Sequence, residues 1–286
     1  MGEHPSVFEC AKELEKIGAD VKYVPLNSDG VIDIEAYKTL IEKGDVGFIS
    51  VQHVSNETGA INPIKKLVKL ARKFNNNVLF HSDGVQAFMK FTFSLADLDV
   101  DYYTISAHKI YGPKGVGAFY VKKGVKINPL IFGGGQENGV RSGTENIFGI
   151  VSFALSVEKN LKDREKNYEQ VSQMRNELLK ELENLNVNYK VYSNGIPHIL
   201  SVCLNTEVRG ETLVHALEKK GVYISTGSAC SSTKHMNRTL ESMGVNKNEI
   251  LCANRISFSP YMNFNAKKVA LIIQEELKKL EDRKYE

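Results

Sequence analysis

Apolar strand-like segments alternate with amphipathic helical segments in the first half of the chain, and this alternation restricts the fold most strongly. The predicted helices are residues 7–14, residues 34–43 and NPIKKLVKLARKF, in which Pro63 lies near the first turn. The predicted strands are DVKYVPL, VGFISVQHV, NNVLFHSD, DYYTISA and VGAFYVK. Because strands buried on both faces are continuously apolar, we expect an α/β fold with a mostly parallel sheet between helices.

The second half has a different pattern. A long helical stretch from Thr144 to about Leu185 would connect two domains. Beyond it, HILSVCLN and RISFS predict strands, and residues 211–220 and 265–283 predict helices of a smaller α+β lobe. We therefore predict a large domain over residues 1–145, followed by a linking helix and a small C-terminal domain over residues 146–286.

Charge and hydropathy argue against several classes of partner. The net charge of +3 comes from 37 basic and 34 acidic residues without a polybasic tract, so we expect neither nucleic acid nor membrane as the main partner. The longest apolar runs have the length of strands, and the first residues lack the apolar core of a signal peptide. These features predict a cytoplasmic protein.

The four cysteines are far apart, without a CxxC pair or metal-ligand spacing, so no metal site is predicted. Cys10 on an apolar helix face and Cys203 in an apolar strand are expected to be inert core thiols, whereas Cys252 is ambiguous. Cys230 lies in STGSACSSTKH, where small polar neighbours are typical of an exposed loop. Cys230 is therefore the candidate reactive thiol.

Two chemically active side chains follow neighbouring predicted strands. Asp83 comes after VLFH and Lys109 after YYTISAH, at the strand ends where open α/β sheets bind ligands. Taken alone, Asp83 is more often a turn-capping aspartate, and a lysine in such a loop is often a surface residue. Together they supply an anchor for a pyridinium nitrogen and an amine for a Schiff base, as pyridoxal 5'-phosphate (PLP) enzymes require.

Five motifs in this order resemble those of the cysteine desulfurases of the NifS/IscS type. They are HSDGVQ, SAHKIYGPKGVGAFYV, GGGQENGVRSGTEN, STGSACSS and NRISFS, and the resemblance extends from Glu3 through the C-terminal helix. Members of this family are PLP-dependent transferases of fold type I, which take sulfur from L-cysteine and leave L-alanine. The resemblance implies the same fold, cofactor and activity here.

The resemblance assigns the cofactor-binding residues. Lys109 would attach PLP covalently and later move the proton at the substrate α-carbon. Asp83 would pair with the pyridinium nitrogen, and Gln86 would hydrogen-bond the phenolic oxygen of the ring. Ser106 and His108 would hold the phosphate.

The resemblance also assigns residues that would contact the substrate, carry the sulfur or reach the second subunit. Asn56 would contact cofactor and substrate, His4 would be a catalytic residue stacked on the ring, and Arg255 would clamp the substrate carboxylate. Thr144 would reach the phosphate of the neighbouring subunit, which implies a homodimer. Cys230 would carry a persulfide and pass its sulfur to an iron–sulfur scaffold, a tRNA-thiolation protein or another acceptor.

Other interpretations stay open at this point. His4 could be a solvated terminal residue and Arg255 a surface ion-pair residue. Another fold-type I enzyme, such as an aminotransferase, epimerase or selenocysteine lyase, would need Asp83 and Lys109 but no Cys230 loop. A catalytically inactive remnant that only dimerises or binds partners is a further alternative.

Family members carry a substantial segment before the histidine that matches His4, including a Gly- and Thr-rich loop that grips the PLP phosphate. This sequence contains no counterpart of that loop. We therefore expect an N-terminally truncated desulfurase that retains cofactor weakly and leaves apolar surface of its sheet uncovered.

Overall fold

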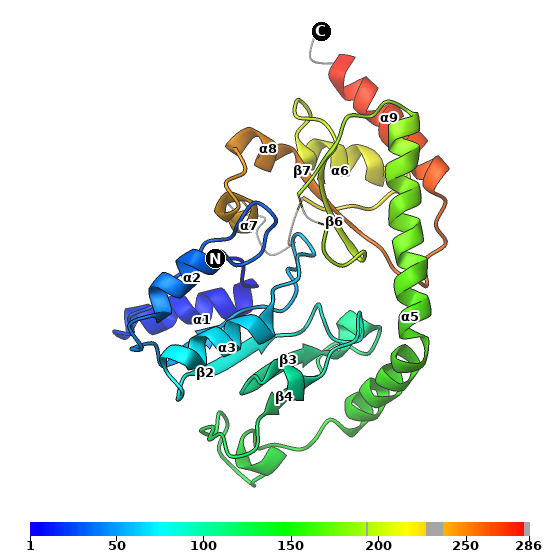
Figure 1. The fold of residues 1–286 in the computed structure, drawn as a ribbon. Coiled ribbons are helices and arrows are strands. Elements are labelled where there is room, and N and C mark those ends of the chain that lie inside the picture. The colour runs from blue at the N-terminus through cyan, green and yellow to red at the C-terminus, as the bar shows by residue number, and fades with distance from the viewer. Residues whose placement is uncertain (193, 227–236, 283–286) are drawn as a thin grey trace.

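A computed structural model describes residues 1–192, 194–226 and 237–282. It contains a four-stranded sheet formed by the first half of the chain and a three-stranded sheet formed by the second half. The long helix α5 (Ile147–Asn184) runs past both sheets, which lie at opposite ends of the molecule (Figure 1). The predicted α/β architecture is therefore confirmed.

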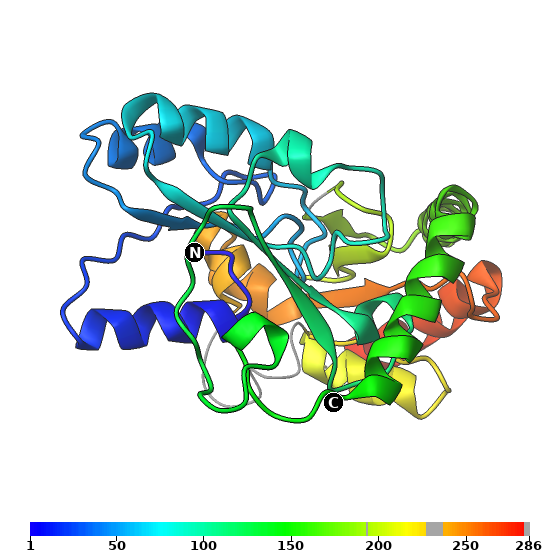
Figure 2. The same cartoon turned by 90° about the horizontal axis from the view of Figure 1, so that it is seen from below.

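The first sheet is mostly parallel. Its order is β1 (Phe48–Ser50), β2 (Leu79–Asp83), β3 (Tyr102–Ser106) and β4 (Gly117–Val121). The first three strands are parallel, whereas β4 runs antiparallel to β3. Figure 2 shows α2 (Ile34–Ile41) and α3 (Ile64–Phe74) on one side of this sheet and α1 (Pro5–Lys16) on the other.

Local sequence explains why α2 and α3 begin where they do. Asp33 caps α2, because its Oδ1 accepts hydrogen bonds from two backbone amides of the first turn, each at 3.0 Å. Pro63 precedes α3 at its N-cap position, as expected of a proline near a first turn. The buried face of α3 consists of Ile64, Leu67, Val68 and Ala71. Helical spacing thus turns these four residues towards the sheet.

Helix α5 connects two hydrophobic cores. Near its beginning, Phe153 packs with Ala107 and Ile110 of the first sheet's end. Further along, Val171 and Leu178 belong to the second core, together with residues of the second sheet and of its flanking helices. No helix within the described ranges is long and apolar enough to cross a membrane.

The second sheet is antiparallel, with the order β5 (Lys190–Val191), β6 (Ile199–Cys203) and β7 (Ala253–Ser257). The surrounding helices are α6 (Gly210–Glu218), α7 (Arg238–Ser242), α8 (Lys247–Cys252) and α9 (Ala266–Asp282). Leu240 and Met243 nevertheless pack into the core of the first sheet. The domain boundary after residue 145 therefore stays a prediction.

Two sequence-based expectations are wrong. The segment DVKYVPL forms no strand, because no neighbouring strand pairs with it and only Leu26 makes an isolated bridge, to Ile32. Cys10 is exposed rather than a core thiol, because Phe8 is the buried residue of α1. Cys203 and Cys252 are both buried.

Candidate active site

The two candidate residues Asp83 and Lys109 lie at the same edge of the first sheet. Asp83 is the last residue of β2, and Lys109 lies in the short 3₁₀ helix η1 (Ala107–Ile110) that directly follows β3. Because β2 and β3 are parallel neighbours, with Asp83 opposite Thr104, their carboxyl ends meet at one edge. The predicted convergence of these two residues is therefore found.

Asp83 is a buried carboxylate held among positive charges. Only 9% of the residue is exposed, and its Oδ1 accepts a hydrogen bond from the Val85 amide at 2.9 Å. Burial raises the pKa of Asp83, whereas this hydrogen bond and the charges of His4 and Lys109 oppose the rise. A cation placed against Asp83 would therefore find a partner of opposite charge that water does not screen.

Gly84 allows the chain to turn directly after Asp83. A Cβ at this position would lie 1.9 Å from the Tyr103 Cε1 atom, so only glycine fits against that ring. The Tyr103 hydroxyl in turn lies 2.8 Å from the Nδ1 atom of His53, whose backbone amide donates to the Asp83 carbonyl at 2.8 Å. Gln86 lies partly buried in the turn that follows.

Ser106, His108 and Lys109 share one turn. Ser106 occupies the N-cap position of η1, but its hydroxyl does not cap the helix. His108 is exposed, and partial desolvation of its ring, followed by the charges of Lys109 and Lys114, lowers its pKa. The turn thus carries a hydroxyl, an imidazole and the Lys109 amine within four consecutive residues.

His4 is a helix cap rather than a solvated terminal residue. Its Nδ1 accepts a hydrogen bond from the Ser6 amide at 3.2 Å and lies 2.8 Å from the Ser6 hydroxyl. This contact fixes the imidazole at the beginning of α1, near enough for its charge to act on Asp83. Its stacking on a cofactor ring stays a prediction.

Asn56 and Arg255 come together from opposite halves of the chain. The Arg255 guanidinium donates to the Asn56 carbonyl at 3.0 Å and lies 3.5 Å from a Glu57 carboxylate oxygen. Asn56 is 8% exposed, and its Oδ1 is buried without a hydrogen-bond partner. Arg255 is therefore part of a polar cluster rather than an isolated surface residue.

Glu57 was not predicted as a site residue, although it lies in SNETG beside Asn56. Its two carboxylate oxygens accept from the side-chain amides of Asn56 and Asn237, both at 3.0 Å. The sequence signal that could have identified Glu57 was its position as a single acidic residue within a motif of small polar residues. Its contact with Arg255 depends on the packing of β7 against this loop, which sequence spacing does not reveal.

Two predicted residues are not joined to this cluster. Thr144 is exposed, and within the described part of the chain no hydrogen bond or ion pair connects it to the other candidates. Cys230 lies outside the described residues. In the same described ranges, no group of three or more His, Cys, Asp or Glu side chains could hold a metal ion.

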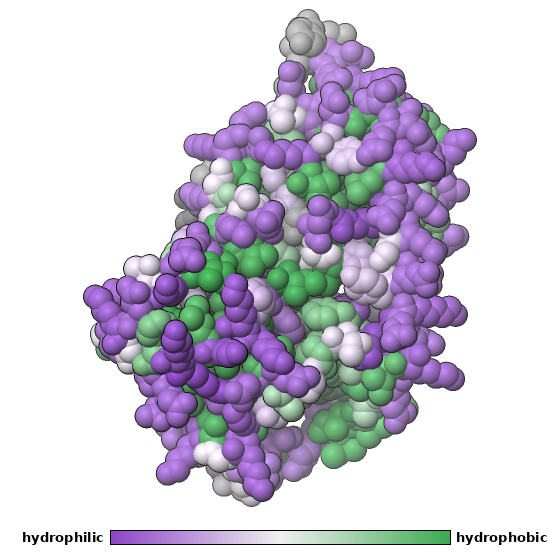
Figure 3. All heavy atoms as spheres, viewed as in Figure 1, coloured by the Kyte–Doolittle hydropathy of each residue, from purple (hydrophilic) through white to green (hydrophobic). Residues whose placement is uncertain are grey.

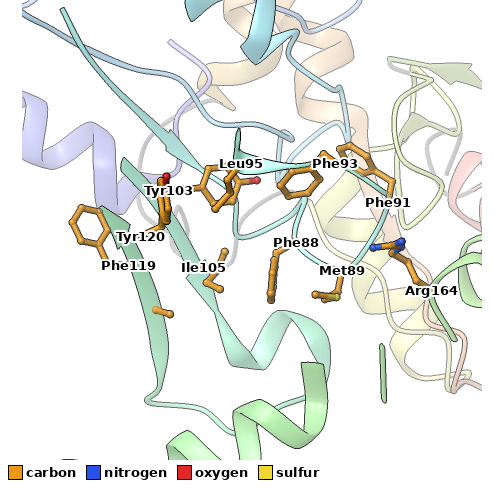
Figure 4. Close-up of a pocket in the computed structure, with 11 residues that line it drawn as sticks. Phe88, Met89, Phe91, Phe93, Leu95, Tyr103, Ile105, Phe119, Tyr120 and Arg164 are labelled. Atoms are coloured by element: carbon orange, nitrogen blue, oxygen red, sulfur yellow. The ribbon is translucent and has the colours of Figure 1, made fainter. Parts of the chain in front are cut away.

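A separate apolar cavity of about 250 Å³ lies against the first sheet. Figure 4 shows its lining, with Phe119 of β4 at one end and Arg164 of α5 at the other. Neither Asp83 nor Lys109 lines it. The cavity therefore lacks the polar groups of the strand-end cluster and is not the candidate active site.

Glu3 is a second buried carboxyl that sequence reasoning did not select. Its Oε1 accepts from the Gln52 amide at 2.6 Å, whereas its Oε2 is buried without a partner. Burial, and after it the negative charge of Asp83, raises the pKa of Glu3 to about 7. A glutamate beside a histidine near the beginning of a sequence carries no pattern that distinguishes it from a surface residue.

The sequence profile of the aminotransferase class-V family matches residues 1–266. The chain therefore belongs to the aminotransferase class-V family. It is 39% identical over 236 residues to a protein named cysteine desulfurase IscS from Dictyoglomus turgidum, and this match covers 81% of the chain.

The fold of this chain is also similar to those of solved structures. A NifS-like protein superposes with a TM-score of 0.89 at 37% identity, over 98% of this chain and 74% of that one. A structure of SspA in complex with cysteine has a TM-score of 0.77 at 29% identity, over 91% of this chain and 72% of that one. The chain spans only 58% of the length of the Dictyoglomus relative.

The raised pKa of Glu3 makes a prediction about stability and pH. Between the ordinary pKa of 4.5 and the folded value of about 7, the folded chain binds a proton that the unfolded chain releases, so stability falls as pH rises through this interval. Glu3→Gln removes this loss. Urea unfolding should therefore show the variant gaining about 2 kcal/mol relative to the native chain between pH 5 and pH 8.

Glu9→Gln is the matched control, because it removes an exposed carboxylate from neighbouring α1. It should leave the pH dependence of unfolding as it is in the native chain. A Glu3→Gln variant whose stability runs parallel to that of the native chain at every pH would show that Glu3 is not the buried acid described here.

Proposed function

We propose that this chain is a PLP-dependent cysteine desulfurase, which takes sulfur from L-cysteine and leaves L-alanine. The observation that carries the proposal is the meeting of Asp83 and Lys109 at adjacent strand ends, with His4 acting on the same carboxylate. The names of the similar proteins support it, since they include cysteine desulfurase IscS and a NifS-like protein.

The residues at this edge fit PLP. The Lys109 amine would attach it, and the buried Asp83 carboxylate would hold the proton on its ring nitrogen. Ser106 and His108, on the turn that carries Lys109, would donate to the phosphate. The Asn56 Oδ1, buried without a partner, is a polar atom that a bound group would satisfy.

Gln86 would complete the ring contacts from the turn after Asp83, and His4 would cover the ring. The substrate carboxylate would bind Arg255, whose planar fork has donors beyond the one that reaches the Asn56 carbonyl. This position suits an amino acid, and the related SspA structure is described as a complex with cysteine. We propose L-cysteine as the substrate on this basis.

When bound, PLP would supply an electron sink for the bonds at the substrate α-carbon. The Lys109 amine would take the proton from that carbon and return it later. The Cys230 thiolate would attack the substrate sulfur, so that an S–S bond forms as the C–S bond breaks, and the carbon is protonated to give L-alanine. L-cysteine and one thiol thus give L-alanine and one persulfide, without an external oxidant.

The persulfide sulfur would then pass to an acceptor protein, for example an iron–sulfur scaffold. The free thiols of Cys10 and Cys203 suit the reducing cytoplasm proposed as the compartment. An aminotransferase, epimerase or selenocysteine lyase would share the Asp83 and Lys109 arrangement. Cys230 is therefore the residue whose replacement separates these possibilities.

Cys230→Ser should abolish sulfide production while preserving cofactor binding, because a serine hydroxyl cannot accept sulfur as a persulfide. The assay incubates the PLP-loaded chain with L-cysteine and dithiothreitol, which releases persulfide sulfur as sulfide, and measures sulfide and alanine together. We expect both products to fall at least about 100-fold.

Cys10→Ser is the matched control, since it removes an exposed thiol from α1. It should turn over like the native chain. Unchanged sulfide and alanine from Cys230→Ser would exclude the proposed desulfurase mechanism. A PLP-loaded native chain without turnover would instead favour the inactive remnant.

We also propose that the chain forms a homodimer through the beginning of α5 and the segment before it. Phe148 and Leu130 are 83% and 80% exposed, and Phe132 is 82% exposed. Apolar side chains gather at the lower right of the molecule, where α5 begins (Figure 3). Thr144 lies between these residues in the sequence, so a second copy seated here would meet Thr144.

Phe148→Glu should weaken this association, because it places a charge at the centre of an apolar contact. Light scattering after size exclusion should give twice the chain mass of 32.0 kDa for the native protein. The variant should give the mass of one chain. Ile17→Glu, at a residue 81% exposed after α1, is the control and should remain dimeric. A native chain that is monomeric throughout the micromolar range would overturn the proposal.

A further inference from the structure

Lys90 is a buried ammonium that the proposed chemistry does not use. It is 9% exposed, and no carboxylate of the described residues forms an ion pair with it. Its Nζ instead lies over the aromatic face of Tyr111, 5.0 Å from the ring centroid. A buried cation without a carboxylate partner is costly, so its position calls for a physical explanation.

The backbone at both ends of this contact is strained. Met89, directly before Lys90, has φ +59°, and Tyr111 has φ +66°, both in the left-handed region that non-glycine residues seldom adopt. Tyr111 ends η1, the turn that carries Lys109. Strain of this kind persists only where surrounding contacts hold it, and it is concentrated at functional sites.

Several contacts hold Tyr111 in place. Its ring meets the Tyr261 ring edge-on, with centroids 4.7 Å apart, and the Lys159 Nζ lies 4.7 Å from the centroid of Tyr261. Each of the two tyrosine rings is therefore in contact with one lysine. The inner lysine, Lys90, is the one whose charge reaches the candidate active site.

Among the residues that the structure describes, no group of opposite charge offsets the positive charge of Lys90. Burial, and after it the charge of Lys109, lowers the pKa of Lys90 to about 8. His198 is 6% exposed, and burial together with the charge of Lys90 lowers its pKa to about 3, so this imidazole is neutral. Asp83 also interacts electrostatically with Lys109.

We propose that Lys90 is a positioning residue for Lys109: its buried charge favours the neutral amine, and its contact with Tyr111 fixes the turn on which that amine lies. The proposal rests on the proposed role of Lys109. A lysine that forms a covalent link or accepts a proton must be neutral, and a neighbouring desolvated cation is one way to make it so. Electrostatic coupling is mutual, so each lysine lowers the pKa of the other while it is itself protonated.

The test measures amine pKa values in the folded chain without added cofactor or substrate. Trace labelling with acetic anhydride across pH 6 to 11, followed by peptide mass spectrometry, reports the neutral fraction of each lysine. In Lys90→Met the pKa of Lys109 should rise, because a neighbouring positive charge is removed. Lys90→Arg keeps the charge, and Lys159→Met removes the outer cation, so both should leave Lys109 as in the native chain.

If Lys90→Met does not fold, the variant Lys109→Met tests the same interaction between the two lysines. In Lys109→Met the pKa of Lys90 should rise, because the positive charge of Lys109 is removed. Unchanged titration of Lys109 in folded Lys90→Met, or of Lys90 in Lys109→Met, would overturn the proposal. Because neither measurement involves turnover, a chain without desulfurase activity would contradict the proposed function and leave this result standing.

Discussion

The parallel pairing of β2 with β3 is the constraint on which the candidate site depends. It brings the end of β2, with Asp83, beside the end of β3, from which η1 and Lys109 continue. Gly84 permits this arrangement, because any side chain there would collide with the Tyr103 ring. The strand pairing thus brings an amine and a buried carboxylate that are 26 positions apart in the sequence to the same edge of the sheet.

A second feature of the site is that ionisable groups of the same charge type act on one another. Asp83 and Glu3 are two buried acids, and each raises the cost of ionising the other. Lys109 and Lys90 are two amines in the same relation, because a positive charge on Lys109 lowers the pKa of Lys90. A site built in this way holds protons and charges that shift when a group of opposite charge binds, which is the requirement for acid–base chemistry at neutral pH.

The sequence predicted the sheet and the strand-end residues well, because continuous apolar strands and helical spacing are local signals. Asp83 and Lys109 could be paired because both directly follow strands. The segment DVKYVPL was misjudged, since apolar alternation cannot say whether a partner strand lies beside it. Glu57 and Lys90 were missed because their importance arises from Arg255 and Tyr111, contacts made only after distant segments pack.

The central claim is that Lys109 is the amine to which the cofactor attaches. Incubation of the chain with PLP, reduction with borohydride to make an imine link permanent, and peptide mass mapping would test it directly. The account predicts one pyridoxyl group on the peptide containing Lys109, and its loss in Lys109→Ala. A label on Lys90, Lys114 or another lysine, with Lys109 unmodified, would contradict the account.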